Sequence, residues 1–294
     1  MSVVVARFCC GSGDRVCWVG VAACLLAACS LVVDEDRKQC LTDADCGALS
    51  SASTLCVDSW CQPDPRWSCL DRASVSTPQA QETFPVTLRL ENILTQTPIP
   101  GVEAKLCLGA YDECEQATGE SVLSNEQGIV QFAIEPGPVR RPPSGLVLLA
   151  RPDLVPGMYL ISTTLDRGNG TLPLQLLNNI DAARLAEQLG TELDPSLGTV
   201  LVSVFDCEHE PAPGVSLILQ GPSASGTPFY AVDGLPAATA TMTDQSGYAG
   251  LLNAPPGTLV VTGQLEGLDA LIATVAVTVR AGTITYLRMV PRGI

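Results

Sequence analysis

The sequence predicts a mainly β protein in which two tandem antiparallel β-sandwiches follow a signal peptide and a short disulfide-stapled module. Short apolar runs separated by Gly- and Pro-rich turns fill most of the chain after residue 84, and such spacing is typical of a sandwich. One pattern of turns and strands occurs twice in the same order, which indicates two copies of one domain. Closely spaced cysteines near the N-terminus predict the stapled module.

The composition sets limits on size and partners. The chain has 294 residues, of which 46% are hydrophobic, enough for about two domains with ordinary cores. Its 16 basic residues face 31 acidic ones, a net charge of -15, so nucleic acid and anionic surfaces are poor partners. Only Lys38, Lys105 and His209 supply lysine or histidine, and no cofactor is expected.

The N-terminus has the layout of a signal peptide. Arg7 and Arg15 precede an apolar run over residues 16–28, and Cys29 follows. The run Leu26-Ala27-Ala28-Cys29 resembles the bacterial lipobox. By that resemblance residues 1–28 are cleaved and Cys29 becomes the acylated first residue, with palmitate among its chains, because two or more acyl chains anchor a protein stably.

An uncleaved anchor helix is the alternative, since residues 16–33 are an unbroken apolar or small run near the lower length limit for spanning. Both interpretations place the rest of the chain outside the cytoplasm. Ser30 after the cysteine resembles lipoproteins sent to an outer membrane. The expected location is therefore the cell envelope, lipid-anchored at the outer membrane.

The cysteines left after cleavage and acylation are even in number, which fits four disulfides. The first four lie in a polar segment without apolar periodicity, so residues 29–83 form a module that needs staples. Zinc is the rival interpretation, but the spacing lacks paired short knuckles and an exported chain favours oxidation. Cys107 and Cys114 can form a local staple, leaving Cys69 and Cys207 as a pair. The predicted disulfide residues are Cys40, Cys46, Cys56, Cys61, Cys69, Cys107, Cys114 and Cys207, and no metal site is expected.

The repeat rests on turn residues. A Pro-x-Pro-Gly-Val turn at residues 98–102 occurs again at 211–215, each leading into an alternating apolar strand. Asn125-Glu126-Gln127-Gly128 matches Asp244-Gln245-Ser246-Gly247, and a Pro-Gly turn at 136–137 matches that at 256–257. We therefore assign sandwich 1 to residues 84–165, sandwich 2 to 198–294, and a linker with a short helix near 180–190 to 166–197.

The turns at residues 243–248 and 255–257, following a Pro-Gly-Val strand, resemble transthyretin-like, carboxypeptidase-regulatory-like sandwiches of bacterial surface proteins. The second copy matches that pattern well and the first more loosely, with Asn125 in place of the usual Asp. The resemblance implies an Ig-like or transthyretin-like fold that accompanies catalytic domains without being catalytic itself. Some related sandwiches carry a Lys–Asn isopeptide bond, which is not expected here because only Lys105 is available.

No enzyme is expected. One histidine cannot supply the usual pair of zinc imidazoles, and His209 lies in an acidic turn without a Gly-x-Ser-x-Gly elbow in the chain. The expected function is a non-catalytic, envelope-anchored surface binding or structural module. An accessory subunit of an envelope complex is the alternative, and carbohydrate-binding or enzymatic roles rank below both. The expected partners are the membrane, through the lipid, and a protein or glycan ligand at the surface. The inserted segment 221–240 is the candidate to meet that ligand, and the equal alternative is a solvated loop without a functional role.

Overall fold

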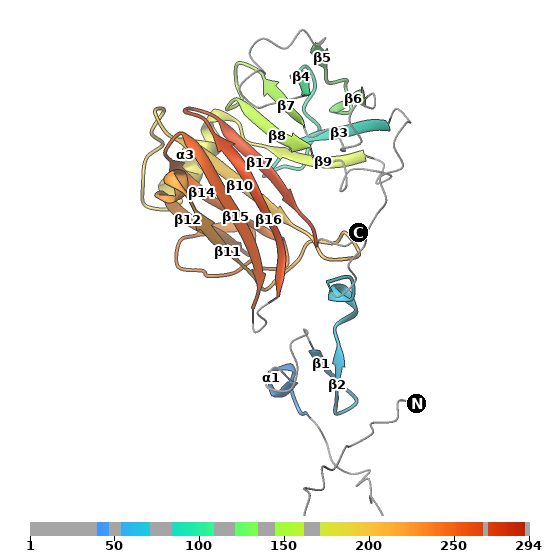
Figure 1. Cartoon of the computed structure of the whole chain (residues 1–294). Coiled ribbons are helices and arrows are strands. Elements are labelled where there is room, and N and C mark those ends of the chain that lie inside the picture. Colours follow the sequence, from blue (N-terminus) through green and yellow to red (C-terminus); the bar gives the residue numbers. More distant parts are fainter. Residues whose placement is uncertain are drawn as a thin grey trace, which may run out of the picture. The chain divides into compact units, whose positions relative to one another are not determined.

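Figure 1 shows the computed structural model of the chain, which is mainly β, as the sequence predicts. The structure describes residues 40–46, 54–70, 84–108, 121–134, 145–161, 171–266 and 270–291. All of them belong to one compact unit, Gln39–Ile294. The predicted signal peptide, residues 1–28, and the anchor residue Cys29 lie outside the described residues.

The cysteine-rich module is small and consists of local elements. It contains a one-turn helix, α1 (Asp43–Cys46), and an antiparallel pair, β1 (Thr54–Val57) and β2 (Trp60–Pro63). A single 3-10 turn over Pro65–Trp67 follows, and the Asp64 side chain caps it by accepting a hydrogen bond from the Arg66 N–H. These elements offer little apolar surface, so the module depends on its covalent links.

The described residues of the first copy of the repeat form seven strands. They are β3 (Phe84–Asn92), β4 (Glu103–Leu108), β5 (Ser121–Leu123), β6 (Ile129–Ile134), β7 (Gly145–Ala150), β8 (Gly157–Ile161) and β9 (Thr171–Leu176). One sheet has the order β6-β3-β9, and the facing strands run β8-β7-β4-β5. Along β3 the buried residues Val86, Leu88 and Leu90 alternate with more exposed ones, as a strand with one face in a core requires.

In the second copy, eight strands lie within the residues that the structure describes. They are β10 (Gly198–Val204), β11 (Val215–Gln220), β12 (Thr227–Val232), β13 (Leu235–Ala237), β14 (Tyr248–Ala254), β15 (Gly257–Leu265), β16 (Leu271–Val279) and β17 (Ile284–Met289). One sheet has the order β11-β15-β16, and the other runs β13-β12-β14-β10-β17. Two tandem sandwiches are therefore present, as predicted.

Strand pairing confirms the duplication that the turns predict. β3 pairs antiparallel with β6 and parallel with β9, and β10 pairs in the same way with β14 and β17. In the facing sheets β4-β7-β8 and β11-β15-β16 are both antiparallel. The copies differ at their margins, where the first adds β5 beside β4 and the second adds β12 and β13 beside β14.

The same pair of hydrogen bonds made by a buried hydroxyl, called the clasp below, occurs in both copies. In the first, the Ser124 hydroxyl donates to the Ile99 carbonyl over 2.8 Å and accepts from the Val102 N–H over 2.9 Å. In the second, the Thr243 hydroxyl donates to the Ala212 carbonyl over 2.7 Å and accepts from the Val215 N–H over 3.0 Å. These bonds tie the Pro-x-Pro-Gly turn to the Gly turn downstream.

The backbone of these downstream turns requires glycine at one position. Gly128 and Gly247 have φ values of +70° and +68°, in the left-handed region. A Cβ on Gly128 would collide with the Leu90 carbonyl oxygen, and one on Gly247 with the Val204 carbonyl oxygen. The backbone therefore passes each strand too closely for any side chain.

One sheet runs through both copies. β17 of the second copy pairs parallel with β8 of the first, Ile284–Tyr286 against Gly157–Tyr159, which gives a nine-stranded sheet in the order β13-β12-β14-β10-β17-β8-β7-β4-β5. The Tyr286 ring lies against Gly157, where a Cβ would come within 2.9 Å of it. Burial raises the pKa of the Tyr286 phenol, and its oxygen accepts a hydrogen bond from the Leu177 N–H over 3.4 Å.

Two apolar cores result. The core of the first copy includes the second-copy residues Leu201, Phe229, Leu252, Ile284 and Tyr286, so the junction between the copies is itself hydrophobic core. The core of the second copy lies between its two sheets and contains Val202, Leu259, Ile272 and Met289. A shared sheet and a shared core make the two copies one rigid body, because relative motion would expose apolar surface.

The predicted linker, residues 166–197, is more structured than expected. It contains the predicted helix as α3 (Asn179–Gln188), which the Asn178 side chain caps and which ends before Gly190 at φ +70°. Ala182 and Ala186 are buried in the first core. The same stretch also contains β9, which pairs with β3, so the first sandwich extends beyond residue 165. Pro173 within β9 weakens its strand pattern in the sequence.

Candidate functional site

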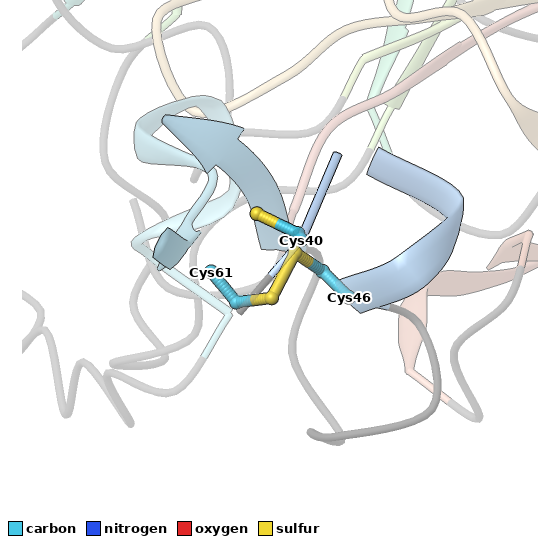
Figure 2. Close-up of side chains that lie close together, drawn as sticks. All are labelled: Cys40, Cys46 and Cys61. Carbon is cyan, nitrogen blue, oxygen red and sulfur yellow. A yellow bond between two sulfur atoms is a disulfide. The ribbon is translucent and has the colours of Figure 1, made fainter. Parts of the chain in front are cut away.

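The cysteine-rich module is held by two disulfides. Cys40 bonds to Cys56 and Cys46 to Cys61, with sequence separations of 16 and 15. Figure 2 shows the sulfurs of Cys40, Cys46 and Cys61 close together, and all three lie within 4.8 Å of one another. The sequence left the connectivity open, and the structure resolves it as first to third and second to fourth.

Three cysteine sulfurs this close together could bind a metal ion as thiolates, but these sulfurs are in disulfides. A cysteine binds metal as a thiolate, whereas each sulfur in the cluster is bonded to another sulfur. The neighbouring acid is also engaged, because Asp45 Oδ2 accepts hydrogen bonds from the Leu41 N–H over 2.8 Å and the Thr42 N–H over 2.9 Å. These bonds, the one from Leu41 foremost, lower the pKa of Asp45. The Asp45 carboxylate therefore stabilises the turn that begins at Leu41.

A third disulfide clamps the segment after the module to the second sandwich. Cys69 bonds to Cys207, 138 positions along the chain, the pair that remained after the other cysteines were assigned. The Cys207 N–H donates to the Arg66 carbonyl over 2.9 Å. Trp67 is 6% exposed and belongs to the core of the second copy, with Leu70 packed against it. The clamp thus combines a covalent bond, a hydrogen bond and an aromatic anchor.

An ion pair shapes the same segment. Asp64 is 2% exposed, and its Oδ2 lies 2.7 Å from Arg66 Nη2. The other carboxylate oxygen accepts from the Arg66 N–H over 3.0 Å. Asp64 therefore holds the turn that presents Trp67 to the core. Sequence reasoning did not find Asp64 and Trp67, because neither residue belongs to a periodic apolar pattern.

His209 lies in the turn that the clamp contacts. Its φ is +66°, and Asp206 closes the turn by accepting from the Glu208 and Glu210 N–H groups over 2.9 and 3.0 Å. Beside this turn, the Arg288 guanidinium lies 4.2 Å over the Phe205 ring. Asp206 is thus occupied with backbone groups of the turn. His209 is half-buried, and its Nδ1 is buried without a hydrogen-bond partner among the described residues, whereas the sequence predicts an exposed turn.

The inserted segment 221–240 is not the loop that the sequence suggested. It contains β12 and β13, which form a hairpin that widens the nine-stranded sheet. Phe229 and Tyr230 are buried, and the Tyr230 hydroxyl accepts from the Leu217 N–H over 2.8 Å. Burial raises the pKa of Tyr230. The expectation of a loop was wrong for β12 and β13, where Phe229 and Tyr230 are buried.

The longest exposed run of the insertion is the tip of its hairpin, residues 232–235. Asp233 and Gly234 have φ values of 52° and 78°, as in the two-residue turns that suit β-hairpins. The Asp233 N–H donates to Asp244 Oδ2 over 2.7 Å, which ties the tip to the Gly turn of the second copy. Val232 and Leu235 flank the tip and are 43% and 58% exposed. Recognition by this segment would use these four residues together with the exposed residues at its two ends, 221–222, 225–226 and 238–239.

Two cavities among the described residues are small. One, of about 20 Å³, is lined mainly by Val155, Leu177, Leu252 and Ile284 at the junction of the copies. The other, of about 10 Å³, lies between Met158 and Thr285. Ligand pockets for small molecules have volumes of roughly 300 to 1,000 Å³, so these two cavities can hold a water molecule at most.

Two other residues that the sequence analysis named are Cys107 and Lys105. Cys107 is buried and disulfide-bonded, but its expected partner, Cys114, lies outside the described residues. Lys105 is on β4, between β5 and β7. Among the residues that the structure describes, no helix has the length and apolar character needed to cross a membrane.

No family model and no curated relative matches the chain. Among solved structures, a shaft pilin, SpaA, from Lactobacillus rhamnosus GG is 14% identical, with a TM-score of 0.25, over 72% of this chain and 99% of that one. A streptococcal ancillary pilin is 14% identical, with a TM-score of 0.24, over 72% and 70%. An intradiol ring-cleavage dioxygenase from Tetranychus urticae is 15% identical, with a TM-score of 0.24, over 36% and 83%.

Proposed function

We propose that this chain is an exported, lipid-anchored protein of the bacterial cell envelope that serves as a non-catalytic surface binding or structural module. The observation that carries this proposal is the set of disulfides Cys40–Cys56, Cys46–Cys61 and Cys69–Cys207. Structural disulfides persist in oxidising compartments and are rare in reducing cytosol. They agree with the apolar N-terminal run and the lipobox-like residues before Cys29.

The clamp supports a tethered arrangement. Cys29 lies a few residues before the stapled module, and the module leads directly into Trp67 and Cys69, which are fixed to the second sandwich. An acyl anchor at Cys29 would therefore hold a rigid pair of sandwiches through a short stapled stalk. A carboxypeptidase-regulatory-like family membership, with its accompanying and non-catalytic role, is part of the same proposal.

The polar groups support a structural role for the scaffold. Catalysis needs a nucleophile or metal beside a tuned acid or base in a pocket. Here Asp45, Asp64, Asp206 and Asp244 each accept hydrogen bonds from backbone N–H groups. These carboxylates are committed to turns. Recognition through loops and sheet edges fits such a scaffold better than turnover.

The anchor can be tested with two cysteine variants. Cys29→Ala should abolish fatty-acid labelling and leave the precursor uncleaved, because the acylated residue is lost. Cys24→Ala, within the apolar run, is the matched control and should be labelled and cleaved normally. Normal labelling of Cys29→Ala would contradict the lipid anchor, and an uncleaved but membrane-held wild type would favour the anchor helix instead.

A further inference from the structure

The β1–β2 hairpin of the cysteine-rich module has one disulfide-bonded face and one exposed face. Val57 and Trp60 are paired directly across the two strands, so their side chains lie on the same face. Their neighbours Cys56 and Cys61 lie on the opposite face, because successive side chains of a strand alternate. Disulfides tie that opposite face to residues 40–46.

The face that carries Val57 and Trp60 is apolar and open. The same alternation adds Leu55 and Gln62 to it, and we call these four residues the Trp60 face. Val57 and Trp60 are 40% and 44% exposed, and neither belongs to an apolar core of the described residues. No residue of the Trp60 face is charged, and the nearest charge along the chain is Asp58 in the turn between the strands.

A further apolar side chain lies close to this hairpin. The Cys40 N–H donates to the Ser59 carbonyl over 3.3 Å, so Leu41, the next residue, lies beside the turn that joins β1 to β2. Leu41 is 76% exposed. Single exposed apolar residues are common on protein surfaces, whereas several of them gathered in one place indicate a surface that meets another apolar phase or partner.

The two tryptophans that remain after the predicted signal peptide have opposite environments. Trp67 is 6% exposed and belongs to the core of the second copy, whereas Trp60, seven positions earlier, is 44% exposed. Tryptophan is enriched where a membrane meets water, because its ring is apolar and its indole N–H can stay hydrated. Trp60 therefore has the exposure and the chemistry of an interfacial residue.

The proposed lipid anchor keeps the module near a membrane. Cys29 and Cys40 are eleven positions apart, and eleven residues span at most about 40 Å even when fully extended. Acyl chains on Cys29 would therefore confine the module to a thin layer over the bilayer. Such confinement gives a weak second contact a high effective concentration of its target.

We propose that the Trp60 face lies in the interface of the bilayer that holds Cys29, as a second membrane contact that orients the module. This inference rests on the lipid anchor proposed above. The lipid is zwitterionic, because a net charge of -15 is repelled by anionic headgroups, whereas an ammonium headgroup can lie beside Asp58. A glycan would need several polar groups converging on the ring, and Gln62 alone is polar on the Trp60 face.

The test is tryptophan fluorescence of the full chain, isolated with its anchor and reconstituted into phosphatidylcholine vesicles with or without brominated acyl chains. Bromine quenches tryptophans that lie in the bilayer, so the wild type should lose emission when brominated lipid is present. Trp60→Phe is the background and should lack the quenched part of the emission. The difference between these two chains isolates Trp60, even where Trp18 of the apolar N-terminal run is retained.

A matched pair of variants tests the Trp60 face itself. Val57→Asp should abolish quenching of Trp60, because a carboxylate directly opposite the ring is costly to bury. Val232→Asp is the control, because Val232 is 43% exposed and also precedes a two-residue hairpin turn, and it should be quenched as the wild type is. Val57→Leu keeps the face apolar and should retain the quenching. Alkylation and mass measurement of the two module disulfides check that Val57→Asp is folded.

The outcomes separate this inference from the anchor. A fatty-acid-labelled wild type without quenching of Trp60 would overturn the membrane contact and leave the anchor standing, including the case in which the face serves a glycan or another protein. Full quenching in Val57→Asp, or its loss in Val232→Asp or Val57→Leu, would also overturn the contact. An unlabelled chain that still binds vesicles would contradict the lipid anchor, while quenching of Trp60 in it still decides the contact. A chain that is neither labelled nor bound would contradict both.

Discussion

The two sandwiches share their pairing pattern and their clasp but differ in what surrounds them. The first copy has its β8 edge covered by β17 and its inner face extended by α3. The second copy instead receives the Trp67 anchor and the Cys69–Cys207 bond, and adds the hairpin β12–β13. Duplication therefore kept the turn chemistry that closes a sandwich, while the margins of each copy acquired the contacts that join the molecule together.

Among the contacts that distinguish the two copies, the Cys69–Cys207 disulfide should contribute most to the free energy of unfolding. Replacing Cys69 and Cys207 together by Ala should lower the free energy of unfolding by about 4 to 5 kcal/mol, because the bond closes a very long loop. Urea unfolding measures this change. The control is Cys46→Ala with Cys61→Ala, which opens only a local loop and should leave the sandwiches nearly unchanged. Equal losses in the two double variants would show that the clamp has no special role.

Trp67 should contribute nearly as much to the free energy of unfolding. Trp67→Ala removes a side chain that is 6% exposed and fills the second core, and such truncations cost about 3 to 5 kcal/mol. Trp60→Ala is the matched control, because Trp60 is 44% exposed and its loss should change stability by less than about 0.5 kcal/mol. If Trp67→Ala behaves like the control, the segment is not part of the core.

The clasp allows the same bond to be removed from each copy. Ser124→Ala and Thr243→Val each leave a buried N–H, of Val102 or Val215, and a buried carbonyl without their hydroxyl partner. Each should cost about 1 to 3 kcal/mol, measured by thermal unfolding. Similar losses would confirm that the clasps are equivalent, and a neutral effect in one copy would break the equivalence.

The smallest expected difference is a dependence on pH at the downstream Gly turn, where the second copy has Asp244 and the first has Asn125. Burial opposes ionisation of Asp244, but hydrogen bonds from Ser246 and from the Asp233 and Gly234 backbone outweigh it and hold the pKa of this carboxyl below its usual 3.8. A lowered folded-state pKa gives stability that is present above the unfolded pKa and is lost as pH falls through the folded value. The equivalent residue, Asn125, does not titrate.

Melting temperatures measured between pH 7 and pH 2 check this difference. Asp244→Asn should remove part of the acid destabilisation, since the amide keeps the size of the side chain without its charge. Asn125→Asp is the reciprocal variant and should add a similar dependence in the first copy. Identical pH profiles for the wild type and Asp244→Asn would contradict the assigned role.

The sequence predicted those features that depend on local chemistry. Gly128 and Gly247 mark backbone positions that only glycine can occupy, so the repeat was visible from its turns. The pairing of β8 with β17 was not predictable, because β8 is a short apolar run whose partner leaves no local pattern. The hairpin had a signal, Asp233-Gly234 between apolar runs, which was missed because the segment was treated as an insertion.

The predictions of site residues divide in the same way, into those with a local sequence signal and those without one. Cysteine counting anticipated the Cys69–Cys207 pair, since few cysteines remained for it. Burial of Trp67 was not anticipated, because a lone aromatic residue in a polar segment carries no periodicity from which to infer a core. The sequence predicted β16 as a half-buried strand, but its position at the end of the sheet β11-β15-β16 follows only from the sheet order.

The central claim is that two copies of one sandwich are fused into a single rigid platform by the shared sheet and the junction core. Differential scanning calorimetry of the chain tests it most directly. The account predicts one transition in which the calorimetric and van't Hoff enthalpies agree, and destabilisation of that single transition by Thr243→Val and Ser124→Ala alike. Two separable transitions, each shifted by only one of these substitutions, would show that the sandwiches unfold independently and would contradict the account.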